Sequence, residues 1–192
     1  MPLLFLLLFL IISCFVVWGV YNFILVKGKI TFTKRPFLVA LYFTVAATST
    51  VLVAISVNSS AIRYLLFILL GWLLFALLRP GRFLLSVYID VVYQQLFFWL
   101  LLFLIDKVWP GQVGVVFVMF FTLFHLPIYL LTHINKLGKL LITPVFIAGG
   151  FVIYFLITST LYGWVLAIAV HTAFYILLWE VVDKKHHTGL IC

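Results

Sequence analysis

Charge is the scarcest property of this sequence: only 8% of its 192 residues are charged, and only four are acidic. A soluble globular domain carries about 25% charged residues, because its surface must be polar. With 67% hydrophobic residues, this chain lacks the polar side chains that would cover a water-facing fold of its length. The composition is typical of a bundle embedded in a lipid bilayer, and we expect one membrane domain over residues 1–192.

Cysteine is almost absent as well. Cys14 lies in an apolar run and Cys192 is the last residue, so the sequence offers neither a disulfide framework nor a metal-binding spacing. Residues 11–14 loosely resemble a lipoprotein cleavage site, but residues 1–15 contain no Lys or Arg, which a secretory signal requires. We therefore expect an uncleaved first membrane span.

Long apolar runs, in contrast, fill most of the chain. A helix needs about 20 apolar residues to cross the hydrocarbon core, because its backbone polar groups must be satisfied within the segment. Seven stretches pass this test: Pro2–Leu25, Pro36–Val57, Ala61–Leu78, Phe83–Ile105, Val113–Leu131, Leu140–Thr158 and Trp164–Val182. The segments between them are rich in residues that favour turns. We predict an all-α membrane protein, a polytopic bundle of about seven transmembrane helices.

The positions of the basic residues support this count and predict an orientation. Ten of the twelve Lys and Arg residues follow the first, third, fifth and seventh stretches, which leaves only Arg63 and Lys107 on the other side. The positive-inside rule then places the N-terminus outside and the C-terminus in the cytoplasm. We expect the membrane to be a prokaryotic cytoplasmic membrane. We attribute the net charge of +8 to topology and to lipid headgroups, so membrane lipids are expected partners and nucleic acid is not.

Few strongly polar side chains lie within the predicted spans, and their cost in lipid makes them functional candidates. The fourth stretch contains Asp90, Gln94 and Gln95, of which the first two are four residues apart on one helical face. The fifth contains His125 and the seventh His171, at comparable depth. We expect a shared polar pocket between these three helices, although each group could instead serve helix packing or interhelical hydrogen bonding.

Three short motifs occur across residues 83–182, about half of the chain. Gln94-Gln95-Leu96-Phe97-Phe98-Trp99 stands where a Glu-Glu-x-x-x-Arg motif would be, Phe121 to His125 matches Phe-x-x-x-His, and His171 is followed four residues later by Tyr175 instead of Asn or Asp. In this order the motifs resemble the CAAX protease and bacteriocin-processing family (CPBP or Abi) of intramembrane glutamic peptidases. The resemblance implies that residues 83–182 form a membrane core of that type.

The departures from the family pattern bear on activity. In the family, the paired glutamates are thought to activate a water for attack on a peptide carbonyl, whereas a glutamine amide cannot accept the proton of that water. Either the chain is a natural degenerate member, or two Glu-to-Gln changes were introduced; the further replacements at 99 and 175 favour the first. The resemblance implies degenerate catalytic positions at Gln94, Gln95, His125 and His171, and a cavity lined by Asp90, Trp99, Phe121 and Tyr175.

Four functions remain open. The favoured one is a non-proteolytic binding, scaffolding or bacteriocin-immunity protein that holds a lipid, a peptide or a partner transmembrane helix, with no cofactor. A second is a hydrolase in which His125 or His171 is the base and Asp90 orients its ring. A third is haem bound by His125 and His171, or a divalent metal bound by these two histidines together with Asp90. A fourth is transport, with Pro127 and Gly149-Gly150 interrupting the fifth and sixth spans.

Overall fold

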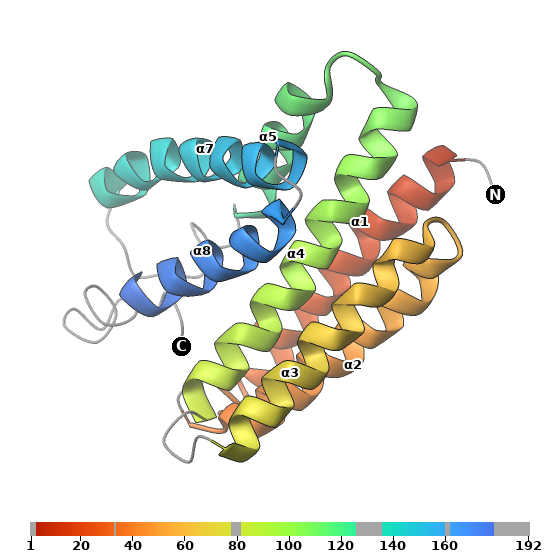
Figure 1. Ribbon diagram of the computed structural model, residues 1–192. Coiled ribbons are helices and arrows are strands. Elements are labelled where there is room, and N and C mark those ends of the chain that lie inside the picture. Colours follow the sequence, from red (N-terminus) through yellow and green to blue (C-terminus); the bar gives the residue numbers. More distant parts are fainter. Residues whose placement is uncertain (1–2, 33, 78–81, 126–135, 160–161, 179–192) are drawn as a thin grey trace. The chain divides into compact units, whose positions relative to one another are not determined.

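The computed structural model describes residues 3–32, 34–77, 82–125, 136–159 and 162–178. Within these residues the chain forms seven α-helices and no β-strand (Figure 1). The helices are α1 (Leu3–Val20), α2 (Pro36–Ile55), α3 (Arg63–Leu77), α4 (Arg82–Val108), α5 (Val113–Phe124), α7 (Lys136–Ser159) and α8 (Gly163–Leu178). A π-helical turn, η1 (Tyr21–Leu25), extends α1, and a 3₁₀ turn, η2 (Ser59–Ile62), precedes α3.

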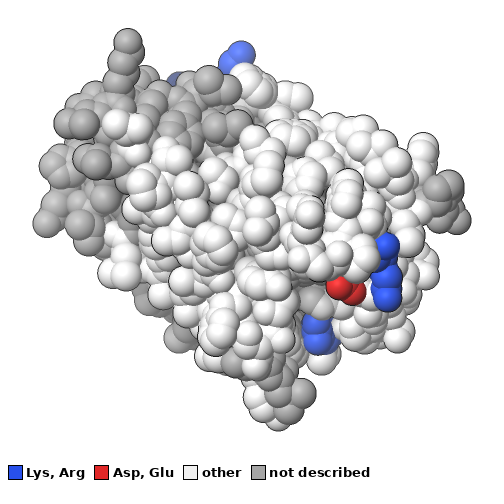
Figure 2. Space-filling model, turned by 90° about the horizontal axis from the view of Figure 1, so that it is seen from above, with Lys and Arg blue, Asp and Glu red and all other residues white. Residues whose placement is uncertain are grey.

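Four helical segments are long and apolar enough to cross a bilayer: Leu3–Leu25, Pro36–Ile55, Phe83–Val108 and Ile142–Ser159. Three further apolar helices, Ser59–Leu74, Val113–Phe124 and Gly163–Leu177, are shorter. Nearly all of the described surface visible in Figure 2 is uncharged. Helices of this composition satisfy their backbone polar groups internally, which is what a hydrocarbon environment requires.

The fifth predicted span differs from the structure. We expected a helix over Val113–Leu131, but α5 ends at Phe124. His125 is its C-cap residue, and the His125 backbone N–H donates a hydrogen bond to the Thr122 carbonyl at 3.1 Å. Pro127, two residues further along the sequence, has no N–H to donate to the carbonyl four positions earlier, so a helix is expected to stop near it. The continuous helix through His125 was therefore a wrong prediction, and residues 126–131 lie outside the described part of the chain.

The glycine pair of the sixth predicted span serves helix packing. α7 continues through Gly149 and Gly150 without interruption. A Cβ atom on Gly150 would lie 3.2 Å from the Phe121 ring of α5, so the missing side chain lets the two helices pack closely. The helix break that the transport hypothesis would need at these glycines is absent from α7. Pro127, the other residue on which the transport hypothesis relied, lies outside the described residues.

Two compact units divide the chain, residues 1–100 and residues 101–191. The first contains α1, α2, α3 and most of α4, which lie side by side in Figure 1, and the second contains the end of α4 with α5, α7 and α8. The core of the first unit includes the fully buried side chains of Phe43, Ala47 and Tyr64. That both units form one domain stays a prediction.

Candidate functional site

The eight predicted site residues fall into two groups, one in each unit. α4 carries Asp90, Gln94, Gln95 and Trp99 in the first unit, whereas the second unit has Phe121 and His125 at the end of α5 and His171 and Tyr175 on α8. All are buried except Trp99 and Tyr175, which are half-buried. The structure brings residues together within each group, and a single pocket for both groups stays a prediction.

Asp90 and Gln94 form a hydrogen-bonded pair on α4. The Gln94 Nε2 donates to Asp90 Oδ2 at 3.0 Å, which is the i,i+4 contact that their spacing predicts. Asp90 is only 1% exposed, and its Oδ1 has no hydrogen-bond partner among the described residues. A buried acceptor without a donor costs about 1–3 kcal/mol. The Gln94 amide thus serves the adjacent carboxyl group and has no basic nitrogen or oxygen with which to activate a water.

Cys14 and Tyr93 link α1 to α4 close to this pair. The two side chains are buried and lie close to each other. The sequence predicts no role for Cys14, because its neighbour lies on a distant helix and no local spacing signals the contact. The pair extends the polar face of α4 towards α1.

Trp99 stands where the family pattern has an arginine, yet a guanidinium reaches it from α3. The Cζ atom of Arg63 lies 5.1 Å from the centroid of the Trp99 ring and 5.6 Å from that of Tyr64. These are cation–π distances. From the sequence, Arg63 is only a charge in an outer connection, and a count of charges contains no signal for such a tertiary contact.

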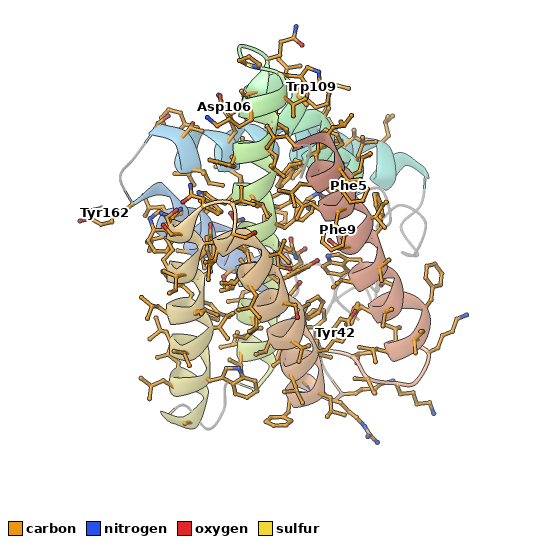
Figure 3. The ribbon with its side chains drawn as sticks, turned by 90° about the vertical axis from the view of Figure 1, so that its right-hand side faces the viewer. Phe5, Phe9, Tyr42, Asp106, Trp109 and Tyr162 are labelled. Atoms are coloured by element: carbon orange, nitrogen blue, oxygen red, sulfur yellow. The ribbon has the colours of Figure 1, made fainter. Side chains whose placement is uncertain are left out.

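A groove lies between α1 and α2, and α4 forms its floor. Its volume is about 300 Å³. Figure 3 shows Phe9 of α1 and Tyr42 of α2 in the space between the two helices. The lining consists of Leu6, Phe9, Leu10, Ser13 and Val17 from α1, Tyr42, Val45, Ala46, Ser49, Thr50 and Val53 from α2, and Tyr93 and Leu100 from α4. The groove thus lies wholly within the first unit.

The hydroxyl groups in this groove mostly donate to the protein itself. Tyr42 donates from α2 to the Val17 carbonyl of α1 at 2.6 Å and so bridges the groove at one end. The hydroxyls of Ser13 and Thr50 each donate to a carbonyl of their own helix at 2.8 Å. With most donors engaged and most of the lining apolar, the groove suits a hydrocarbon ligand better than a polar one.

His125, in the second unit, lies close to two aromatic rings. Its ring centroid is 4.5 Å from that of Phe121 and 4.6 Å from that of Phe146. The Nδ1 atom lies 2.6 Å from the Phe121 carbonyl oxygen. Because a carbonyl can only accept, Nδ1 carries the hydrogen, and Nε2 of the neutral ring keeps its lone pair. This tautomer has the form of a general base or of a metal ligand.

His171 extends this cluster from α8. Its ring centroid lies 6.5 Å from that of Phe121 and 5.2 Å from that of Tyr175. The predicted neighbours of the second unit are thus together, in surroundings that are aromatic. The part of the chain that the structure describes contains no group of three His, Cys, Asp or Glu side chains that could hold a metal ion.

No protein-family model, no curated protein and no solved structure matches this chain. The resemblance to the CPBP family therefore remains a prediction that rests on the motifs alone.

Proposed function

We propose that this chain is a multi-pass membrane protein that binds a hydrocarbon chain and has no peptidase activity. The proposed topology has seven spans, with the N-terminus outside and the C-terminus in a prokaryotic cytoplasm. Four long apolar helices and the alternation of basic connections support it.

The proposal describes a degenerate CPBP-like protein. The motif order supports the relationship, and the Gln94 amide, bonded to Asp90, supports the loss of the water-activating base. An immunity-type or scaffolding role in the membrane would need binding without cleavage, which these residues permit.

The groove between α1 and α2 is the observation that carries the binding function. From Tyr42 to Val53, α2 rises about 16 Å. A groove of this length, with a volume of about 300 Å³ and a mostly apolar lining, suits an extended alkyl chain.

Photolabelling tests this assignment. Membranes that contain the protein are supplied with a phospholipid whose acyl chain carries a diazirine, and labelled peptides are identified by mass spectrometry. We expect labels on α1 and α2 at groove positions, and their loss in Ala46→Phe, which fills the groove. The matched control is Leu52→Phe, on the same helix but 65% exposed and outside the groove lining. Equal labelling of the wild type and both variants would contradict the proposal.

A hydrolase remains a second candidate because of one observation, the lone pair on His125 Nε2. A broad screen for peptide cleavage by the purified protein distinguishes the two functions. We expect no peptide cleavage by the wild-type protein and none by the His125→Ala variant. Turnover by the wild type that disappears in His125→Ala would favour the hydrolase.

A further inference from the structure

The connection between α1 and α2 carries four basic residues and no acidic one. Lys27 and Lys29 follow η1, and Lys34 and Arg35 precede α2; all four side chains are exposed. Every residue from Tyr21 to Tyr42 is uncharged apart from these four. Four cations at the ends of two adjacent apolar helices create a local field that attracts an anion.

An aromatic cluster beneath this connection fixes its shape. Phe32 is 4% exposed, and its ring centroid lies 5.3 Å from that of Tyr21 and 6.0 Å from that of Phe43. Next to it, the buried Thr31 accepts two hydrogen bonds. The Lys34 backbone N–H donates to Thr31 Oγ1 at 3.2 Å, and the Arg35 backbone N–H donates to the Thr31 carbonyl at 2.9 Å. Lys34 and Arg35 are thus presented from a fixed backbone.

Lys29 is held in a backbone conformation that lysine rarely adopts. Its φ angle is +61°, in the left-handed region where glycine or asparagine is favoured. Two backbone hydrogen bonds close the turn: the Gly28 N–H donates to the Ile24 carbonyl at 3.0 Å, and the Ile30 N–H donates to the Leu25 carbonyl at 2.9 Å. A cation therefore occupies a position where the backbone alone would favour a different residue.

We propose that these four residues bind the phosphate group of an anionic phospholipid, one acyl chain of which passes along the outer side of the Tyr42–Val17 hydrogen bond and lies in the α1–α2 groove. From Arg35 to Tyr42 the helix rises about 10 Å, and half of a hydrocarbon core measures about 15 Å. An acyl chain that starts at this connection thus reaches the groove. The inference rests on the proposed function, which supplies the bilayer and the binding of a hydrocarbon chain.

The test compares two lipids with the same acyl chains. The purified full-length protein in a non-ionic detergent is titrated with phosphatidylglycerol or phosphatidylcholine, and binding is followed by native mass spectrometry and by thermal unfolding. We expect tighter binding of phosphatidylglycerol. In Lys34→Gln/Arg35→Gln, the affinity for phosphatidylglycerol should fall by about fivefold per cation removed, while that for phosphatidylcholine is unchanged. Lys107→Gln, which removes an exposed cation elsewhere, is the control and should have no effect.

Lys29→Gly separates binding from folding. Glycine relaxes the left-handed backbone, so the lipid-free protein should unfold at the same or a higher temperature, while its affinity for phosphatidylglycerol falls. Unchanged affinity in both this variant and Lys34→Gln/Arg35→Gln would overturn the inference.

Three other outcomes also decide against it. Equal binding of both lipids, abolished by Ala46→Phe, would overturn the headgroup site and leave the proposed function intact. Stabilisation by inorganic phosphate equal to that by phosphatidylglycerol would indicate a free-anion site. Binding of neither lipid would contradict the inference and the proposed function together.

Discussion

Asp90 in the first unit and His125 in the second are both buried polar groups, but their surroundings differ. Asp90 depends on one hydrogen bond from Gln94, and its Oδ1 has no partner among the described residues. His125 has a hydrogen bond to the Phe121 carbonyl and two phenyl rings close to its own ring. The first unit therefore stabilises its polar group by pairing, and the second chiefly by shape. Substitutions at four sites test this difference, from the largest expected effect to the smallest.

Removing the imidazole should have the largest effect. His125→Ala leaves a cavity close to two phenyl rings, and we expect a loss of about 3 kcal/mol in the free energy of unfolding. His125→Phe keeps a ring of similar shape and loses only the Nδ1–H bond, so it should cost about 1 kcal/mol. Chemical denaturation of the purified protein measures both. If the two variants lose the same stability, hydrogen bonding rather than shape governs the second unit.

Breaking the carboxyl–amide pair should cost somewhat less. Gln94→Leu removes the donor to Asp90 Oδ2 and leaves a buried carboxyl group, at an expected cost of about 2 kcal/mol. The double variant Asp90→Leu/Gln94→Leu removes both partners and should recover most of this loss, since an apolar pair leaves no unsatisfied group. The same denaturation assay applies. A double variant less stable than Gln94→Leu would show that Asp90 has a further partner.

Substitutions in the glycine pair of α7 test the packing around Phe121 and His125 with a smaller expected loss of stability. Gly150→Ala places a Cβ atom 3.2 Å from the Phe121 ring, which must shift against His125, and we expect a loss of about 1 kcal/mol. Gly149→Ala is the matched control, because its Cβ atom would lie at an ordinary contact distance of 3.7 Å. Thermal unfolding should rank Gly150→Ala below Gly149→Ala, and the reverse order would contradict the packing described for α5 and α7.

The smallest expected effect concerns Arg63. Arg63→Gln removes the cation near the Trp99 ring and should cost about 0.5 kcal/mol, whereas Arg63→Lys retains a cation and should cost less. Tryptophan fluorescence provides a second measurement, because the environment of Trp99 changes in the first variant. Identical stability and spectra for all three proteins would show that this contact contributes nothing.

Local patterns predicted much of the fold. Hydropathy located the helices, since each apolar run had to satisfy its own backbone, and the i,i+4 spacing predicted the contact of Asp90 with Gln94. The end of α5 was signalled by Pro127, but the apolar residues after it favoured a longer helix. Hydropathy alone therefore overestimated the length of this helix.

Contacts between distant segments could not be predicted in this way. The groove arises because α1 and α2 diverge over a floor supplied by α4, and no run of residues records that arrangement. The approach of Arg63 to Trp99 is of the same kind. Gly149 and Gly150 show the opposite difficulty, because the same two residues are compatible with a helix break or with close packing, and only the neighbouring Phe121 distinguishes them.

Native mass spectrometry of the protein extracted from membranes tests the central claim, that the α1–α2 groove binds a lipid chain. We predict one retained phospholipid per wild-type and Leu52→Phe chain, and its loss from Ala46→Phe at unchanged thermal stability. Equal lipid retention by all three proteins, or no retained lipid in any of them, would contradict the account.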